Sequence, residues 1–204
     1  MVTNKHKDFV LRLYDECNNH AKEQAVRRDQ VIAFYIVVCA FYLNWKICYE
    51  LPLLILLNIA MILLGAICCL VLISFRSWII QYGNCAEAVG KLLICDKTLK
   101  TQEEISLFLE VNCKKKPDSF IKYIKRMGNV VIIGFILITL APFIKSYELL
   151  TRLCSCNAYA AIIVCIVAAL YVYKLVSYHF KMSNMALTQE NEITWIIRFN
   201  DFKE

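Results

Sequence analysis

The sequence predicts an all-α membrane protein with four transmembrane helices arranged as two hairpins, and with helices that extend into a cytoplasmic helical region. Two observations lead to this fold class. Residues 51–75 (LPLLILLNIAMILLGAICCLVLISF) carry no formal charge, and as a helix they would span roughly 37 Å, more than the ~30 Å hydrocarbon core of a bilayer. The whole chain of 204 residues is 59% hydrophobic, with a mean hydropathy of +0.53. Such a composition is typical of a membrane protein rather than a soluble domain.

Four apolar runs are long enough to cross a bilayer, and they cover residues 31–49, 51–75, 127–144 and 158–173. Inside hydrocarbon every backbone amide must be satisfied within its own segment, so we expect helices rather than open strands. This reading divides the chain into a cytoplasmic amphipathic helix (1–30), a first transmembrane hairpin (31–75), a cytoplasmic helical region (76–126), a second transmembrane hairpin (127–173) and a cytoplasmic C-terminal segment (174–204).

The distribution of basic residues predicts the orientation of these spans. Six Lys and Arg residues precede the first span, ten lie between the second and third, and four follow the fourth. Only Lys46, Lys145 and Arg152 lie in the two remaining loops. Because Lys and Arg are concentrated on the cytoplasmic side of membrane proteins, we expect both termini and the central segment to be cytoplasmic.

The helices are expected to continue beyond the membrane. From about residue 4 to the first span, apolar residues recur at a three-four spacing without Gly or Pro, which predicts one unbroken amphipathic helix. After residue 75 the second helix should continue in the same way, with Gly83, Ala86 and Gly90 permitting close contact between the two. Further on, Thr101 and Glu104 form a capping box for a short helix. The apolar residues Trp195, Ile196 and Phe199 predict a C-terminal segment docked on these helices, with an interfacial position on lipid as the alternative.

No catalytic pattern is present in the sequence. The three histidines have no carboxylate or cysteine at ligand spacing, and no phosphate-binding loop or nucleophile motif occurs, so we expect neither an enzyme, nor a metal site, nor a cofactor. Most of the eleven cysteines fall within spans or on the reducing cytoplasmic side, where we expect free thiols. A bond between Cys48 and either Cys154 or Cys156 on the outer side stays open.

A cluster of basic residues lies on the predicted cytoplasmic face. It comprises Lys114, Lys115, Lys116, Lys122, Lys125 and Arg126, joined by Arg27 and Arg28. These residues could fix the topology and contact anionic lipid headgroups, at about 1 kcal/mol per basic residue near the surface. Alternatively, they could bind a nucleotide or oligonucleotide in a salt-sensitive way, without reading its bases.

Asn58 and Thr139 are the polar side chains near the middle of the spans, and they are the candidates for a pore lining. An asparagine in this position more often joins helices than lines a pore. No Asp, Glu, Lys, Arg or His occupies the middle of any span, which argues against a proton-coupled or ion-coupled transporter. A pore formed between subunits is compatible with this pattern, because a hydrophobic constriction can gate by dewetting.

A polar helix ends in RRDQVIAFYIVV as it enters the first span, and the second span leads into FRSWIIQYGNCAEAVGKLL. In architecture and residue character this layout resembles the SLATT-type bacterial membrane effectors associated with anti-phage nucleotide signalling. With its second hairpin, the chain is most similar to the four-span channel effector of the Hailong defence system, and next to the membrane subunit of the Kiwa system. The resemblance implies a homo-oligomeric inner-membrane channel, with a tetramer favoured. It also implies a ligand made by a partner nucleotidyltransferase, which could open or close the channel.

The sequence therefore predicts an oligomeric ion channel of an anti-phage defence system, gated by a nucleotide or oligonucleotide at its basic cytoplasmic region. One alternative is a non-conducting membrane sensor or adaptor that recruits a soluble effector. A second alternative is a structural protein that binds lipid through its basic residues.

Overall fold

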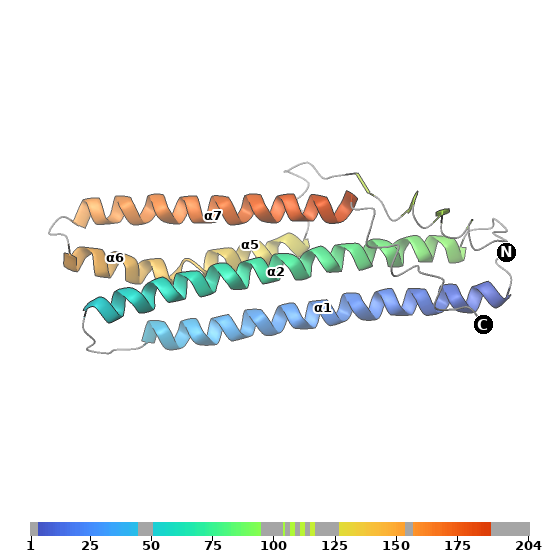
Figure 1. Cartoon of the computed structure of the whole chain (residues 1–204), viewed down its shortest axis with the longest axis horizontal. Helices are drawn as coiled ribbons and strands as arrows, with labels where there is room; N and C mark the ends of the chain where they lie inside the picture. Colours follow the sequence, from blue (N-terminus) through green and yellow to red (C-terminus); the bar gives the residue numbers. More distant parts are fainter. Residues whose placement is uncertain are drawn as a thin grey trace. The chain divides into compact units, whose positions relative to one another are not determined.

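The computed structural model describes residues 4–44, 51–94, 104, 107–108, 111–112, 115–116, 127–153 and 157–188. Within these residues every secondary-structure element is a helix. The helices are α1 (Asn4–Asn44), α2 (Leu51–Ile94), α5 (Met127–Ile138), α6 (Ala141–Leu153) and α7 (Asn157–Thr188) (Figure 1). This confirms the predicted all-helical class. The predicted capping box at residue 101, the outer cysteines and the apolar residues 195–199 lie outside the described residues.

Three helical stretches among the described residues are long and apolar enough to cross a membrane: Leu51–Ile94, Val130–Leu153 and Ala158–Thr188. They correspond to the second, third and fourth predicted spans. The first predicted span, 31–49, is described only as far as Asn44. Its crossing of the membrane, and with it the arrangement as two hairpins, stays a prediction.

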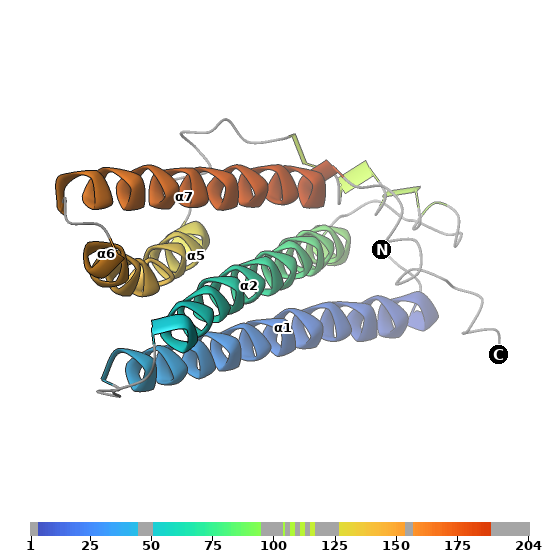
Figure 2. The ribbon, with the colours of Figure 1, turned by 60° about the vertical axis from the view of Figure 1, so that its left-hand side comes forward.

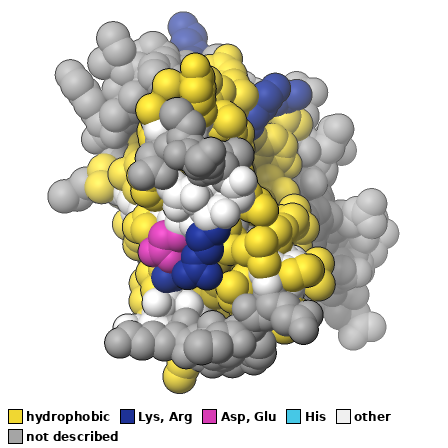
Figure 3. Space-filling view, turned by 90° about the vertical axis from the view of Figure 1, so that its left-hand side faces the viewer, with side chains coloured by type: hydrophobic (Ala, Val, Ile, Leu, Met, Phe, Trp, Pro, Cys, Tyr) yellow, Lys and Arg dark blue, Asp and Glu magenta, His cyan; other side chains and the backbone are white. Residues whose placement is uncertain are grey.

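The apolar helices leave a large hydrophobic surface uncovered. In the most apolar part of α7 only 11% of the residues are buried within the chain, and Phe41, Leu56 and Tyr173 are 74%, 63% and 66% exposed. Figure 3 shows one face on which hydrophobic side chains dominate the described surface, with an acidic and basic cluster near the middle and a few basic groups at the upper edge. Soluble monomers rarely expose apolar patches of this extent, so this surface fits a membrane-embedded protein.

The chain divides into two units. Unit 1 comprises Met1–Arg27, Phe75–Asp118 and Met182–Glu204, and unit 2 comprises Arg28–Ser74 and Ser119–Lys181. Helices α1, α2 and α7 each contribute residues to both units.

The core of unit 1 is the contact between α1 and α2. It contains Val10, Leu13 and Cys17 of α1 together with Cys85, Ala86, Ala88, Val89 and Leu92 of α2. The spacing of these residues puts one apolar stripe on each helix. A side chain at Gly90 would lie 3.7 Å from the ring of Tyr14, whereas nothing lies within 4 Å of Gly83. The predicted pairing of the two extended helices is confirmed, but Gly83 has no part in it.

Unit 2 brings together parts of α1, α2, α5, α6 and α7 (Figure 2). Ring contacts connect several of these helices. The ring of Tyr35 in α1 contacts the ring of Phe135 in α5 edge-on, with ring centres 5.2 Å apart. The ring centres of Phe143 in α6 and Tyr171 in α7 are 5.4 Å apart. Tyr35 and Phe135 are almost fully buried, so aromatic side chains supply much of the contact area inside this unit.

The third predicted span, 127–144, is two helices rather than one. Helix α5 ends at Ile138 and α6 begins at Ala141. Pro142 has no N–H to donate to the carbonyl four residues earlier, so it interrupts the series of backbone hydrogen bonds along the helix. Backbone hydrogen bonds that span three residues instead of four connect the two helices here. They run from the Leu140 N–H to the Leu137 carbonyl (3.0 Å) and from the Phe143 N–H to the Leu140 carbonyl (2.9 Å). Helix α6 then continues to Leu153, and α7 runs past residue 173 to Thr188, so both extend beyond the predicted span ends.

Candidate functional site

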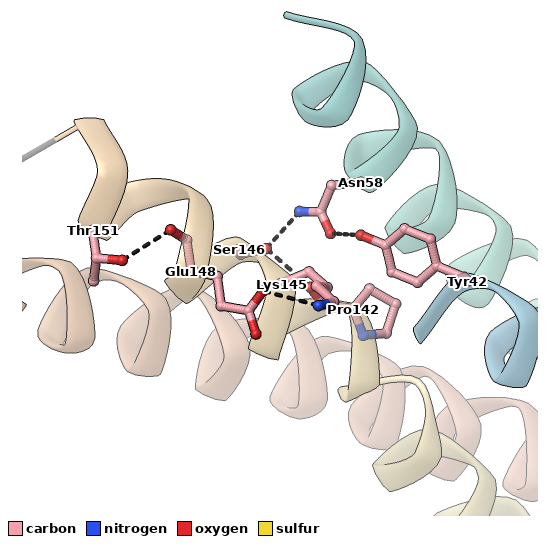
Figure 4. A network of polar contacts seen from close by, with 7 residues as sticks. All are labelled: Tyr42, Asn58, Pro142, Lys145, Ser146, Glu148 and Thr151. Atoms are coloured by element: carbon pink, nitrogen blue, oxygen red, sulfur yellow. Dashed lines mark hydrogen bonds and ion pairs between the residues drawn. The ribbon is translucent and has the colours of Figure 1, made fainter. Parts of the chain in front are cut away.

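A chain of polar side chains connects three helices of unit 2 around Asn58 (Figure 4). The Tyr42 hydroxyl of α1 donates to Asn58 Oδ1 at 2.5 Å, and Asn58 Nδ2 of α2 donates to Ser146 Oγ of α6 at 2.7 Å. Ser146 Oγ in turn donates to the carbonyl of Pro142 at 3.3 Å. Asn58 is 5% exposed, so these bonds satisfy an amide that would otherwise be costly to bury.

The hydrogen bonds around Asn58 connect α1, α2 and α6 within unit 2. They fix the rotation of α1, α2 and α6 relative to one another, because each bond requires a particular side of each helix. Sequence reasoning identified Asn58 but missed its partners Tyr42 and Ser146. A serine one turn after Pro142 was the available signal, since it can bond to the preceding carbonyls near a helix break.

Thr139 lies at the helix break and is completely buried. Its hydroxyl donates to the Ile136 carbonyl at 2.7 Å. It faces Gly65 of α2, where an added Cβ would lie 3.3 Å from Thr139 Cβ and 2.8 Å from the Tyr35 hydroxyl oxygen. The absence of a side chain at Gly65 thus allows α1, α2 and the α5–α6 break to approach closely.

An apolar groove of about 660 Å³ runs along α7 within unit 2. It is lined by Leu140 and by seven residues of α7 between Ala168 and Phe180. Ser177 and the hydroxyl of Tyr173 supply its polar side-chain groups. The groove therefore suits hydrocarbon rather than a charged ligand.

Four of the eight predicted basic site residues fall within the described residues: Arg27, Arg28, Lys115 and Lys116. Arg27 pairs with Glu23 at 2.6 Å and Arg28 with Asp29 at 2.8 Å. Both contacts lie within α1, so the positive charges of Arg27 and Arg28 are partly neutralised by neighbouring carboxylates. Lys114, Lys122, Lys125 and Arg126 lie outside the described residues.

Lys115 is held by Glu87 of α2, and this carboxylate also contacts Lys91 at 2.9 Å. Hydrogen bonds from Lys115 and then Lys91 lower the pKa of Glu87 to about 2. Its side chain is about half exposed, so an anion from solution could compete for the same ammonium groups. Sequence reasoning missed Glu87, because its distance of 28 residues from Lys115 gives no local signal.

The backbone of Lys115 is anchored as well. Its N–H donates to the Leu187 carbonyl at 3.0 Å, in the last turn of α7, where carbonyls lack partners within the helix. Leu187 and Ala186 also pack against Ile80 of α2. Lys115 therefore contacts both α2 and the end of α7 within unit 1.

A row of stacked rings lies between α1 and α2 in unit 1. His20 stacks on Tyr82 with ring centres 5.1 Å apart, and Tyr82 stacks on Trp78 at 5.8 Å. The imidazole nitrogens of His20 lie 3.8 Å from Glu16 and 3.7 Å from Glu23. The row adds aromatic packing to the pairing of the two helices.

Among the described residues no group of three or more His, Cys, Asp or Glu side chains could hold a metal ion. Comparison with protein-family models, with curated proteins and with solved structures found no match to this chain. The resemblance to SLATT-type effectors therefore remains a prediction from the sequence.

Proposed function

We propose that the chain is the subunit of a homo-oligomeric ion channel in the inner membrane, gated by a nucleotide or oligonucleotide that binds its cytoplasmic basic residues. The anti-phage role, the tetrameric state and the partner nucleotidyltransferase belong to the same proposal and rest on the resemblance of the sequence to SLATT-type effectors. Electrical conduction would pass between copies, because Asn58 and Thr139 are buried inside each copy.

The position of Lys115 carries the proposal. Its ammonium contacts Glu87 on α2 and its backbone contacts Leu187 on α7. Both helices continue without interruption into membrane-length apolar segments. A ligand that draws Lys115 away from Glu87 would therefore act on two helices that enter the membrane.

Gating requires that the ligand bind the open and closed states with different affinities. Glu87 provides such a difference in this proposal. Where Glu87 holds Lys115, an incoming phosphate must displace a carboxylate, and where it does not, the ammonium is available. Binding should also weaken as salt concentration rises, because phosphate contacts release counterions.

The test is current recording from the purified protein in planar bilayers, with a set of linear and cyclic dinucleotides and trinucleotides as probes. We expect a nucleotide-dependent change in conductance for the wild type. A K115Q/K116Q variant should need a higher nucleotide concentration for the same change. K145Q is the matched control. Lys145 is also a paired lysine, 2.9 Å from Glu148, but it lies on α6 and outside the basic cluster. The nucleotide dependence of K145Q should equal that of the wild type. Absence of conductance under every condition would reject the channel.

One observation favours a second candidate, the non-conducting sensor or adaptor. In unit 1 the side chains of Ile94, Leu107 and Val111 are 85%, 63% and 65% exposed, and such apolar residues outside the spans are typical of a protein-binding surface. An L107S/V111S variant should then lose its soluble partner in pull-down from the native cell. If that variant keeps its partner, or if the wild type conducts, this second candidate is rejected.

A further inference from the structure

Two thiols face each other inside the α1–α2 contact of unit 1. The sulphur atoms of Cys17 and Cys85 are 3.2 Å apart and both side chains are completely buried. The two residues are 68 positions apart in the sequence, so the folding of two helices against each other, not local geometry, brings them together. Cys39, Cys68, Cys69 and Cys165, the other cysteines among the described residues, lie in the spans predicted from the sequence.

The sides of the helices that meet here are built for close approach. Cys85 is followed on α2 by Ala86 and Ala88, and both are buried in the same cluster. Small residues at a helix contact let the two backbones come near each other. Because a disulfide has a sulphur–sulphur distance of about 2.05 Å, the Cys17 and Cys85 sulphurs need to approach by only about 1.2 Å, which is within the reach of small side-chain rotations.

We propose that Cys17 and Cys85 form an oxidisable dithiol, in which hydrogen peroxide converts the two thiols to a disulfide that links α1 to α2. One thiol reduces the peroxide O–O bond and becomes a sulfenic acid, releasing water. The second thiol then attacks that sulphur, forms the S–S bond and releases a second water. One peroxide thus takes up two electrons and two thiol protons, and a small dithiol reverses the reaction.

Burial sets the condition under which the pair reacts. A thiol that is completely buried meets peroxide only when α1 and α2 separate locally. In a reducing compartment the pair rests as two thiols. Oxidation therefore captures a transient opening of the helix pair and then prevents its recurrence.

The experiment uses the full-length protein in its membranes, treated with hydrogen peroxide and then with N-ethylmaleimide to block remaining thiols. Non-reducing digestion and mass spectrometry should show a Cys17–Cys85 linked peptide in place of the two separate alkylated peptides. Dithiothreitol should restore the separate peptides. A detergent-denatured sample, in which linkages become mixed, shows that the oxidant is active.

Variants separate this pairing from general oxidation. C17A and C85A keep a small apolar side chain in the core, and each should abolish the linked peptide, whereas C165A should leave it unchanged. Oxidation should raise the thermal unfolding midpoint of the wild type by about 5–10 °C, because the cross-link constrains the unfolded chain, and should leave that of C17A unchanged. Recovery of Cys17 and Cys85 as separate alkylated peptides, or their linkage to other cysteines instead of each other, would overturn the proposal.

Discussion

Replacing Gly65 by alanine tests the packing of unit 2 most sharply. The new methyl group would lie 2.8 Å from the Tyr35 hydroxyl oxygen and 3.3 Å from Thr139 Cβ. Ordinary contacts begin near 3.4 Å, so the first of these is too short by about 0.6 Å. Tyr35 and Thr139 are completely buried, and neither can move away into open space.

The expected cost follows from overpacking. Adding a methylene-sized group to a filled core typically costs about 1–3 kcal/mol, while exchanging Gly for Ala within a helix gains up to about 1 kcal/mol. G134A is the matched control, because Gly134 also lies in an apolar helix, α5, but has nothing within 4 Å of its added Cβ. We therefore expect the free energy of unfolding of G65A to lie about 1–3 kcal/mol below that of G134A.

A second substitution identifies the source of the clash. Y35F removes the hydroxyl oxygen and leaves the ring carbon at 3.3 Å as the nearest atom of this residue. In a Y35F background the cost of G65A should therefore fall to below about 1 kcal/mol, giving a coupling of about 1–2 kcal/mol in a double-mutant cycle. The assay is equilibrium unfolding in mixed micelles with increasing sodium dodecyl sulfate. Equal stability of G65A and G134A, or the same cost with and without the Tyr35 hydroxyl, would refute the reasoning.

Four further predictions concern the polar contacts and the break between α5 and α6. N58L should lower the free energy of unfolding by about 1–2 kcal/mol, since two interhelical hydrogen bonds are lost; unchanged stability in the same micelle assay would contradict the role of the network. E87Q should tighten trinucleotide binding up to about fivefold, the equivalent of one surface ion pair, whereas E148Q should not, as measured by equilibrium dialysis. Because the pKa of Glu87 is lowered from 4.5 to about 2, its contact with Lys115 should persist from pH 8 to pH 5 and weaken only as the pH falls toward 2. A Lys115 amide whose protection from hydrogen exchange, relative to the intrinsic rate at each pH, already falls at pH 5 would contradict this. P142A should supply the missing donor and slow hydrogen exchange across residues 137–146, and unchanged exchange would show that proline is not the cause of the break.

The sequence was sufficient for those features that depend on periodicity and apolar length. The unbroken course of α1 from residue 4 and of α2 past residue 75 follows from a three-four pattern of apolar residues without strong breakers in their outer parts. The stripe containing Val10, Leu13 and Cys17 follows from the same pattern. Local sequence encodes these features directly, because each helix must bury one face.

Features that depend on pairs of distant residues were not predictable. Nothing in the sequence near Asn58 indicates that its partners are Tyr42 and Ser146, since they lie 16 and 88 positions away. Likewise Gly83 matched the pattern of a helix contact, but its side of α2 is exposed in the fold. A single sequence gives the period of a helix more reliably than its rotation.

The break between α5 and α6 could have been predicted from Pro142. A proline four residues after Ile138 withholds the N–H that would bond to that carbonyl, yet the apolar composition of 127–144 favoured one continuous span. The structure places the interruption at Thr139 and Leu140. Apolar length alone thus predicts whether a segment can reach across a membrane, but not whether its helix is continuous.

The central claim is that apolar helices cross the membrane with the basic segment and the C-terminus in the cytosol, and topology reporters test it most directly. Green fluorescent protein, which fluoresces inside the cell, and alkaline phosphatase, which is active outside, are fused after Lys116, Leu153 and Glu204. We predict fluorescence after Lys116 and Glu204, phosphatase activity after Leu153, and a chain that stays in membranes washed with alkaline carbonate. Phosphatase activity after Lys116, or release of the chain by carbonate, would contradict the account.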